Sequence, residues 1–469
     1  MILEALQKEL RGVRHSPVRL IALATFFAAS ALAMLAGHWF VDDWSASLAE
    51  AQQQQSESVE SVQNWFAEGV AGPEDRPWVD IAAPLWQDWY AGTRLLREPA
   101  PLAGIATGSL DDSPRVARVN RRANPFLEEG THIENPELGR TEAIDLIFVL
   151  AVLIPLLIGV LGMGCGAYER ETGLVHLIAV QRGRASSWFL ARAAAIAILA
   201  SAAVLVVVAA VVALAGAFNR DGLGLIALAL LYTALWAGLL TATAVAARSR
   251  REAALAYGGV WILLVVLAPT LMSERALSST AANAGLTTAL DQRAKQYEGY
   301  DEEATHLLEH LYSQRPDLKA QPAASLETLP PEIERHVYDW SQMQSLVAEN
   351  QEKAAAERRA IAGTEQAMLW SPTVTLTLAV ERLAGRDLHS AITFRQEVVE
   401  AVNGRIEWIV EQAWRNEPLS LQDFEALLEL TPSSVQPAPA DVKPHLTVLL
   451  VWTVLAWIVG VLRVRRREE

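Results

Sequence analysis

Residues 168–177 read YERETGLVHL, and this short charged segment stands between two long apolar runs, at 143–165 and 188–218. Each run is long enough to cross the hydrocarbon core of a bilayer, which takes about 20 apolar residues. Charged side chains between two spans have to emerge where water can hydrate them, because burying them in lipid is costly. The stretch therefore predicts a membrane protein whose residues 168–177 lie at one membrane surface.

The composition of the whole chain agrees with this class. Hydrophobic residues make up 52% of the 469 residues, and the mean hydropathy is +0.19. An isolated apolar run in lipid satisfies its backbone hydrogen bonds only as a helix. We therefore expect an all-α polytopic fold with six transmembrane helices, at residues 20–38, 143–165, 188–218, 223–245, 253–272 and 446–462, the third to fifth falling within 188–272.

Basic residues beside the spans predict the orientation of the chain. By the positive-inside rule, short loops rich in Lys and Arg stay in the cytoplasm. The loop at 219–222, on the other side, carries Arg220 offset by Asp221. We expect a multi-pass protein of the bacterial inner membrane with both termini cytoplasmic, including the basic tail at 463–469. The basic residues on the cytoplasmic side are Lys8, Arg11, Arg14, Arg19, Arg170, Arg182, Arg184, Arg248, Arg250, Arg251, Arg463, Arg465, Arg466 and Arg467.

The N-terminal residues have an amphipathic pattern. Apolar residues recur at helical spacing through residues 1–13, while Lys8 and Arg11 supply a basic face. This pattern predicts a cytoplasmic interfacial helix within residues 1–19. The following apolar run contains Ala31-Leu-Ala33, a small-residue pattern like that of signal-peptide cleavage sites. Because the run is longer than a signal-peptide core, we expect an uncleaved membrane anchor.

Two long polar segments, 41–142 and 273–445, are then expected outside the cytoplasm as mainly helical insertions. Most of the net charge of −15 resides in them, and the one cysteine, Cys165, excludes an intramolecular disulfide. Residue composition and apolar spacing predict four helices in these insertions. They are expected at about 45–69, 332–369, 390–414 and 423–430.

Several functional classes are disfavoured by the residues. The middle of each apolar run holds no Asp, Glu, Lys or Arg, which an ion-coupled carrier would be expected to use. The chain has no G-x-x-x-x-G-K-[ST] phosphate loop, so we expect no ATP site and no enzymatic activity of its own. His306-Leu-Leu-Glu-His310 has the H-x-x-E-H spacing of inverted zinc proteases. We favour a chance match, because no third ligand stands out.

The segment from Glu169 to Leu174, followed by the Phe189-Leu-Ala-Arg192 entry to the next span, resembles the permease subunit of type-2 ABC transporters. In that family the corresponding segment, here 168–187, is the coupling helix that docks into a cytoplasmic ATPase. The family usually has Pro and then Ser-Arg after this helix, and here Gln181-Arg-Gly-Arg184 replaces them. The resemblance implies ATPase-coupling roles for Glu169, Arg170, Glu171, Gly173, Leu174, Leu177 and Arg184.

The two insertions resemble those of one branch of that family, which carries them after the first and before the last span. Trp370-Ser-Pro372, Leu383-Ala-Gly-Arg-Asp387 and Phe394 resemble a recurrent signature of its outer domain. A helix stop and a turn are favoured over a ligand site for these positions. The signature residues are Ser371, Pro372, Leu383, Ala384, Gly385 and Phe394.

The resemblance implies a permease subunit that couples ATP hydrolysis by a separate ATPase to substrate movement, with export as the default direction. It also implies a second permease subunit, in a homodimer or a heterodimer, and no cofactor in this chain, since ATP binds the partner. A different class remains open: a membrane-anchored scaffold or sensor that binds an envelope partner through its outer insertions. A membrane-embedded hydrolase is disfavoured, because the spans hold no His/Asp/Ser constellation.

Overall fold

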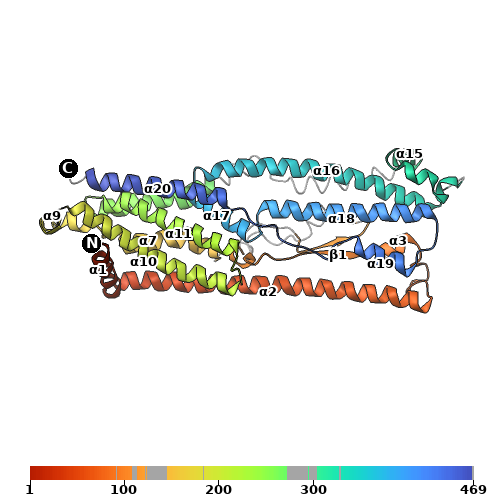
Figure 1. Ribbon diagram of the computed structural model, residues 1–469, viewed down its shortest axis with the longest axis horizontal. Helices are drawn as coiled ribbons and strands as arrows, with labels where there is room; N and C mark the ends of the chain where they lie inside the picture. The colour runs from red at the N-terminus through yellow and green to blue at the C-terminus, as the bar shows by residue number, and fades with distance from the viewer. Residues whose placement is uncertain are drawn as a thin grey trace.

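The computed structural model describes residues 1–90, 92–107, 114–121, 123, 145–182, 184–271, 294, 304–326 and 329–466. The molecule is elongated (Figure 1). A helical bundle at one end holds both chain termini, and further helices extend well beyond its opposite end. We call these two parts the bundle and the distal domain, and we call the bundle face that holds both termini the terminal face.

Six helical stretches in the described part of the chain are long and apolar enough to cross a membrane. This confirms the expected all-α polytopic fold. Three of the stretches contain short π-helical turns, η2 (Val149–Leu153), η3 (Thr241–Val245) and η4 (Ile262–Leu267). The six are α2 (Pro17–Glu68), Leu146–Glu171 (α6 Leu146–Phe148, η2, α7 Ile154–Gly162 and α8 Ala167–Glu171), α10 (Ala185–Leu214), Arg220–Val245 (α11 Arg220–Leu240 and η3), Arg250–Leu271 (α12 Arg250–Trp261 and η4) and α20 (Lys443–Arg466).

Helix α2 is much longer than a membrane span. It begins after Ser16, whose hydroxyl accepts the Arg19 N–H at 3.5 Å, and it ends at Gly69, which adopts the left-handed conformation with φ 68°. Its 52 residues correspond to about 78 Å at 1.5 Å per residue. The predicted span at 20–38 and the predicted arm at 45–69 are therefore one continuous helix, which runs from the bundle along the distal domain (Figure 1).

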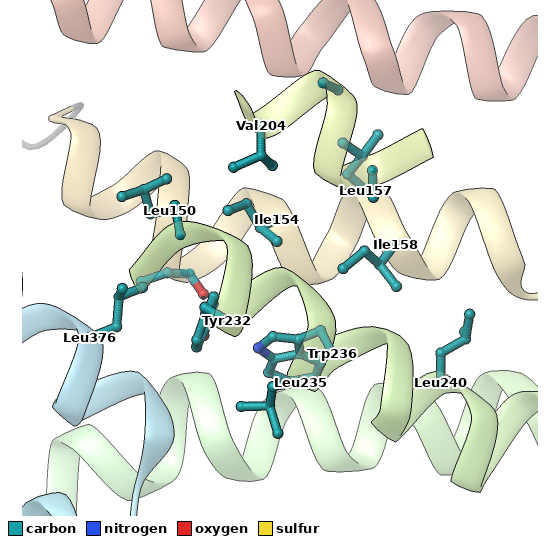
Figure 2. Close-up of a cluster of buried hydrophobic side chains, with 14 of the residues drawn as sticks. Leu150, Ile154, Leu157, Ile158, Val204, Tyr232, Leu235, Trp236, Leu240 and Leu376 are labelled. Carbon is teal, nitrogen blue, oxygen red and sulfur yellow. Dashed lines mark hydrogen bonds between the residues drawn. The ribbon is translucent and has the colours of Figure 1, made fainter. Parts of the chain in front are cut away.

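The bundle core forms where the second span packs against α10 and α11. Figure 2 shows side chains of these helices meeting, with Tyr232 and Trp236 at the centre of the cluster. Small residues bring other helices close, since a Cβ added at Gly238 would lie 3.0 Å from the Ala456 Cβ on α20. The labelled core residues are Leu150, Ile154, Leu157, Ile158, Val204, Tyr232, Leu235, Trp236, Leu240 and Leu376.

Helix α17 (Pro372–Leu383) enters this core, although it belongs to the segment 273–445 that was expected outside. The Thr373 hydroxyl lies 3.1 Å from the hydroxyl of Tyr232, which is 12 residues, or about 18 Å, from the start of α11. The Trp452 indole on α20 also donates to the Leu369 carbonyl at 3.2 Å. Helix α17 therefore packs against the bundle, and the bounds of the outer insertion at 273–445 stay a prediction.

The distal domain combines both insertions and contains a small sheet that was not predicted. Strand β1 (Thr93–Arg97) pairs antiparallel with β2 (Val116–Val119) and parallel with β3 (Ser434–Val435). The predicted helices at 332–369, 390–414 and 423–430 are confirmed as α16, α18 and α19. The helices and 3₁₀ turns of this part are α3 (Pro84–Tyr90), η1 (Ala103–Ile105), α15 (Ala304–Gln314), η6 (Pro316–Ala320), η7 (Pro322–Ser325), α16 (Pro331–Met368), α18 (Leu388–Arg415) and α19 (Leu421–Glu429).

Candidate functional site

The segment between the second and third spans lies at the terminal face of the bundle, where α9 (Val175–Arg182) forms its outermost point (Figure 1). We call residues 166–182 and Arg184 the inter-span segment, which includes α8, the charged end of the second helical stretch. Gly173 separates α8 from α9 with φ 76°, a left-handed conformation that strains any residue with a Cβ. The turn at Gly173 therefore sets the direction in which α9 leaves the bundle.

Glu169 points into the protein. Its side chain is 6% exposed, and Oε2 accepts the Gly166 N–H at 2.9 Å. The other oxygen, Oε1, accepts a hydrogen bond from the Arg192 guanidinium on α10. Glu169 thus fixes the start of the inter-span segment against the third span rather than presenting its charge to solvent.

Arg170 also holds the segment from inside. Its guanidinium donates to the carbonyl oxygens of Val245 and Ala247, the latter at 3.0 Å, and lies 4.8 Å from the centre of the Phe189 ring. Val245 ends the fourth span, and Ala247 lies two residues further along the chain. Arg170 therefore ties the inter-span segment to the third and fourth spans together.

Glu171 is the first charged residue of the segment that faces outward. Its carboxylate accepts the Arg250 Nε–H at 2.9 Å and the Arg250 backbone N–H at 3.3 Å. The two side chains are 41% and 60% exposed, so solvent screens the ion pair and it contributes little to stability. A partner can replace either half of this pair at small cost.

Apolar side chains follow Glu171 on the outside of the segment. Leu174, Leu177 and Val180 recur every three residues and are 41%, 54% and 85% exposed. We call these three residues the apolar ridge. Exposed Glu171 and Arg184 lie before and after it in the chain. Contiguous apolar surface with a polar surround is typical of a site that meets a partner or a membrane.

The sequence-predicted coupling residues therefore separate into two groups. Glu171, Gly173, Leu174, Leu177 and Arg184 are exposed, whereas Glu169 is buried and Arg170 is bonded to backbone carbonyls. The sequence placed Arg192 only in the entry to the third span and indicated no role for it or for its second partner, Glu9. Signals for both were present, because Arg192 is a charge within an apolar run and Glu9 is an acid on a basic amphipathic helix.

The signature residues of the last insertion build a helix start, a turn and a core contact. The Ser371 hydroxyl caps α17 by accepting the Val374 N–H at 3.3 Å. Gly385 turns the chain with φ 64°, and its carbonyl accepts a hydrogen bond from Arg97 at 2.8 Å. The remaining residues, Pro372, Leu383, Ala384 and Phe394, are buried.

The H-x-x-E-H match lies on α15, where the His310 ring packs 5.7 Å from the Trp340 ring. Within the described ranges, the structure gathers no set of three or more His, Cys, Asp or Glu side chains that could hold a metal ion.

Comparison with known families identifies the protein family of the chain. A model described as ABC-2 family transporter protein matches residues 4–350, well over half of the chain, including the inter-span segment. The chain belongs to the ABC-2 transporter family. A further model, a domain of unknown function (DUF3526), matches residues 286–429 of this ABC-2 chain, a range that includes α15 to α18. No curated protein and no solved structure matches the chain.

Proposed function

We propose that this ABC-2 chain is the permease subunit of an ATP-driven transporter and that its inter-span segment is the coupling helix for a separate cytoplasmic ATPase. The observation that carries the proposal is the apolar ridge, which is exposed on a segment whose inner side chains are bonded to several spans. The chain itself has no phosphate loop for ATP.

The surface has the chemistry of a docking site. Interfaces gain most of their affinity from a few central apolar or aromatic anchors, and charges at the rim set register and partner choice. Leu177 supplies such an anchor, and Glu171 with Arg250 supplies a rim charge of each sign. The ridge therefore suits a cleft with an apolar floor and a charged edge.

The inner contacts suit the transmission of force. Glu169 bonds Arg192 on the third span, and Arg170 bonds carbonyls at the end of the fourth. Because packed helices shift between discrete arrangements rather than deforming gradually, a push on α9 would move these spans together. The basic residues around this face support its placement in the cytoplasm.

The assembly we propose has two permease subunits, identical or paralogous, above two ATPase subunits, and it exports its substrate. We base these features on membership of the ABC-2 family and not on contacts in the chain. The large distal domain also suits an anchored scaffold or sensor that binds an envelope partner, and the experiment below separates the two functions.

The test is purification of the tagged chain from its native membrane, followed by assay of vanadate-sensitive ATP hydrolysis. The wild-type chain is expected to co-purify with a nucleotide-binding subunit in stoichiometric amount. Leu177→Asp should reduce the amount of co-purified subunit and the rate of ATP hydrolysis more than tenfold, since loss of an interface anchor costs about 2 kcal/mol or more of binding free energy. Glu171→Lys should give a smaller loss of the same kind.

Leu326→Asp provides the matched control, because Leu326 is a 40% exposed leucine of the distal domain. It should leave ATPase association and hydrolysis unchanged. Recovery of a lone oligomer of the wild-type chain would favour the scaffold. If Leu177→Asp bound the ATPase normally, the apolar ridge would not be part of the ATPase contact.

A further inference from the structure

A buried cluster of three charges joins the inter-span segment to the N-terminal helix α1 (Ile2–His15). The Arg192 Nε–H donates to Glu9 Oε1 at 2.6 Å, and Arg192 Nη1 donates to Glu169 Oε1. Each of the three residues is no more than 5% exposed. We call Glu9, Arg192 and Glu169 the buried charge cluster. One guanidinium thus bridges carboxylates from α1 and α8 while its own backbone belongs to α10.

Two further cations connect the cluster to its neighbours. Arg19, near the start of α2, donates to the second oxygen of Glu9 at 3.1 Å. Lys8 on α1 lies 3.6 Å from Glu169 Oε1, and its ammonium is 5.5 Å from the centre of the Trp188 ring on α10. Four helices, α1, α2, α8 and α10, therefore meet through five charged side chains.

Stability alone does not account for this arrangement. Removing charges from water is costly, and well-packed apolar residues of similar volume often hold helices together at least as well as a buried ion pair. Buried charges instead fix one geometry, because each oxygen and N–H needs its partner in place. The planar guanidinium of Arg192 can satisfy two carboxylates at once, which a lysine ammonium cannot do with the same rigidity.

The position of the cluster gives this fixed geometry a mechanical consequence. Glu169 is two residues before exposed Glu171 and five before Leu174 of the apolar ridge. Arg19 lies at the start of α2, which continues without a break to Glu68 in the distal domain (Figure 1). The cluster thus stands where the proposed docking segment meets the one described helix that runs along both parts of the molecule.

We propose that Arg192 is a positioning residue that joins α1, α8, α10 and the start of α2 into one unit, so that displacement of the inter-span segment reaches the distal domain through α2. This inference rests on the proposed function, because it takes the displacement to come from a docked ATPase. Docking and transmission use different residues. The apolar ridge is exposed, whereas Arg192 is buried, so changes at Arg192 should spare ATPase binding.

The test uses the purified complex of the full chain with its ATPase, reconstituted in lipid nanodiscs. Hydrogen–deuterium exchange is compared without nucleotide and with ATP plus vanadate, for residues 45–68 of α2 and for α18. Wild type is expected to show a nucleotide-dependent change in both regions. Arg192→Lys should retain the bound ATPase and reduce that change at least fivefold, because a lysine ammonium cannot bridge both carboxylates with the same rigidity.

A second variant distinguishes loss of the Arg192 bridge from a folding defect. The triple change Glu9→Gln, Glu169→Gln, Arg192→Gln leaves no charge of the cluster buried and keeps polar side chains at all three positions. It should also bind the ATPase and lose the distal change. Arg466→Gln, an exposed arginine at the same face, serves as the control and should respond like wild type.

The outcomes separate the two proposals. Absence of any ATPase from the wild-type preparation would refute the proposed function. A wild-type complex that hydrolyses ATP without a change in the distal regions would overturn the inference alone. A distal change of normal size in Arg192→Lys or in the triple variant would overturn it as well.

Discussion

The Arg405 guanidinium binds the carboxylate of Asp88, and both side chains are buried in the distal domain. Asp88 belongs to the first insertion and Arg405 to the second, so the bond joins segments that the spans separate in the chain. Arg405 also bonds the Thr93 hydroxyl, and the second Asp88 oxygen accepts the Arg121 N–H at 3.1 Å. The two insertions therefore fold as one unit around this pair.

Replacing Arg405 tests this unit. Arg405→Met should destabilise the distal domain by about 3–5 kcal/mol, because Asp88 is left buried without its counter-ion. The thermal unfolding midpoint of the purified chain measures the loss. Arg415→Met breaks an exposed pair with Glu411 on the same helix, which is worth less than about 1 kcal/mol. Equal midpoints for the two variants would show that the buried pair contributes no more than a surface one.

Acid should destabilise the distal domain through His336. Burial, and then the charges of Arg121 and Arg335, lower the pKa of His336 from 6.5 to about 3. Between pH 6.5 and about 3, His336 is therefore protonated in the unfolded chain and neutral in the folded chain. The contribution of this residue to stability is complete above pH 6.5 and is lost as the pH falls through that window.

The measurement is the unfolding midpoint of wild type and His336→Leu at pH 7.5, 6, 5 and 4. Carboxylates contribute to acid unfolding in both proteins, so the difference between them isolates the histidine. The midpoint of wild type should fall more steeply. Parallel curves would mean that His336 is not held neutral in the folded protein.

The backbones of Gly37 and Gly104 lie in close contact, so we expect that neither position tolerates a larger residue. A Cβ at Gly37 would lie 2.1 Å from the Gly104 carbonyl oxygen. Gly37→Ala should cost about 1–3 kcal/mol, because α2 must move away from η1. Gly404→Ala, at an open position of α18, should instead stabilise by up to about 1 kcal/mol. Thermal unfolding would contradict the contact if both alanines raised the midpoint.

The hydroxyl of Tyr232 should hold α17 inside the bundle. It donates to the Ala151 carbonyl at 3.0 Å and lies 3.1 Å from the Thr373 hydroxyl. Tyr232→Phe should cost about 1–3 kcal/mol, since it leaves buried polar atoms unpaired, and should raise amide exchange over α17. Tyr168→Phe, at a 43% exposed position of the terminal face, is the control. Unchanged exchange of α17 in Tyr232→Phe would refute this anchoring role.

The sequence predicted those elements whose signal is local. Apolar runs gave the spans, and helical spacing gave α16, α18 and α19. The continuity of α2 also had a local signal, because no Pro or Gly occurs from residue 38 to residue 68. The position of α17 had none, since its 12 residues are too few for a span and its burial depends on Tyr232 and Trp452 on other helices.

The location of the candidate site could be predicted from the sequence, but the direction of its side chains could not. A charged segment between two spans could be located from the chain alone. Whether Glu169 and Arg170 face solvent depends on Arg192 and on the carbonyls of Val245 and Ala247, which are distant in sequence. The strands were missed for the same reason, because β1 pairs with β3 across more than 300 residues.

Both the ATPase contact and the transmission through α2 require the inter-span segment and the distal domain to lie on opposite sides of the membrane. Cys165 is the one cysteine and is buried, so Cys165→Ala gives a background for single-cysteine labelling. The test positions are Val180→Cys, 85% exposed, and Trp78→Cys, 65% exposed. In sealed right-side-out vesicles, a membrane-impermeant maleimide should label residue 78 at once and residue 180 only after permeabilisation. Labelling of residue 180 in the sealed vesicles would contradict the topology and the ATPase contact built on it.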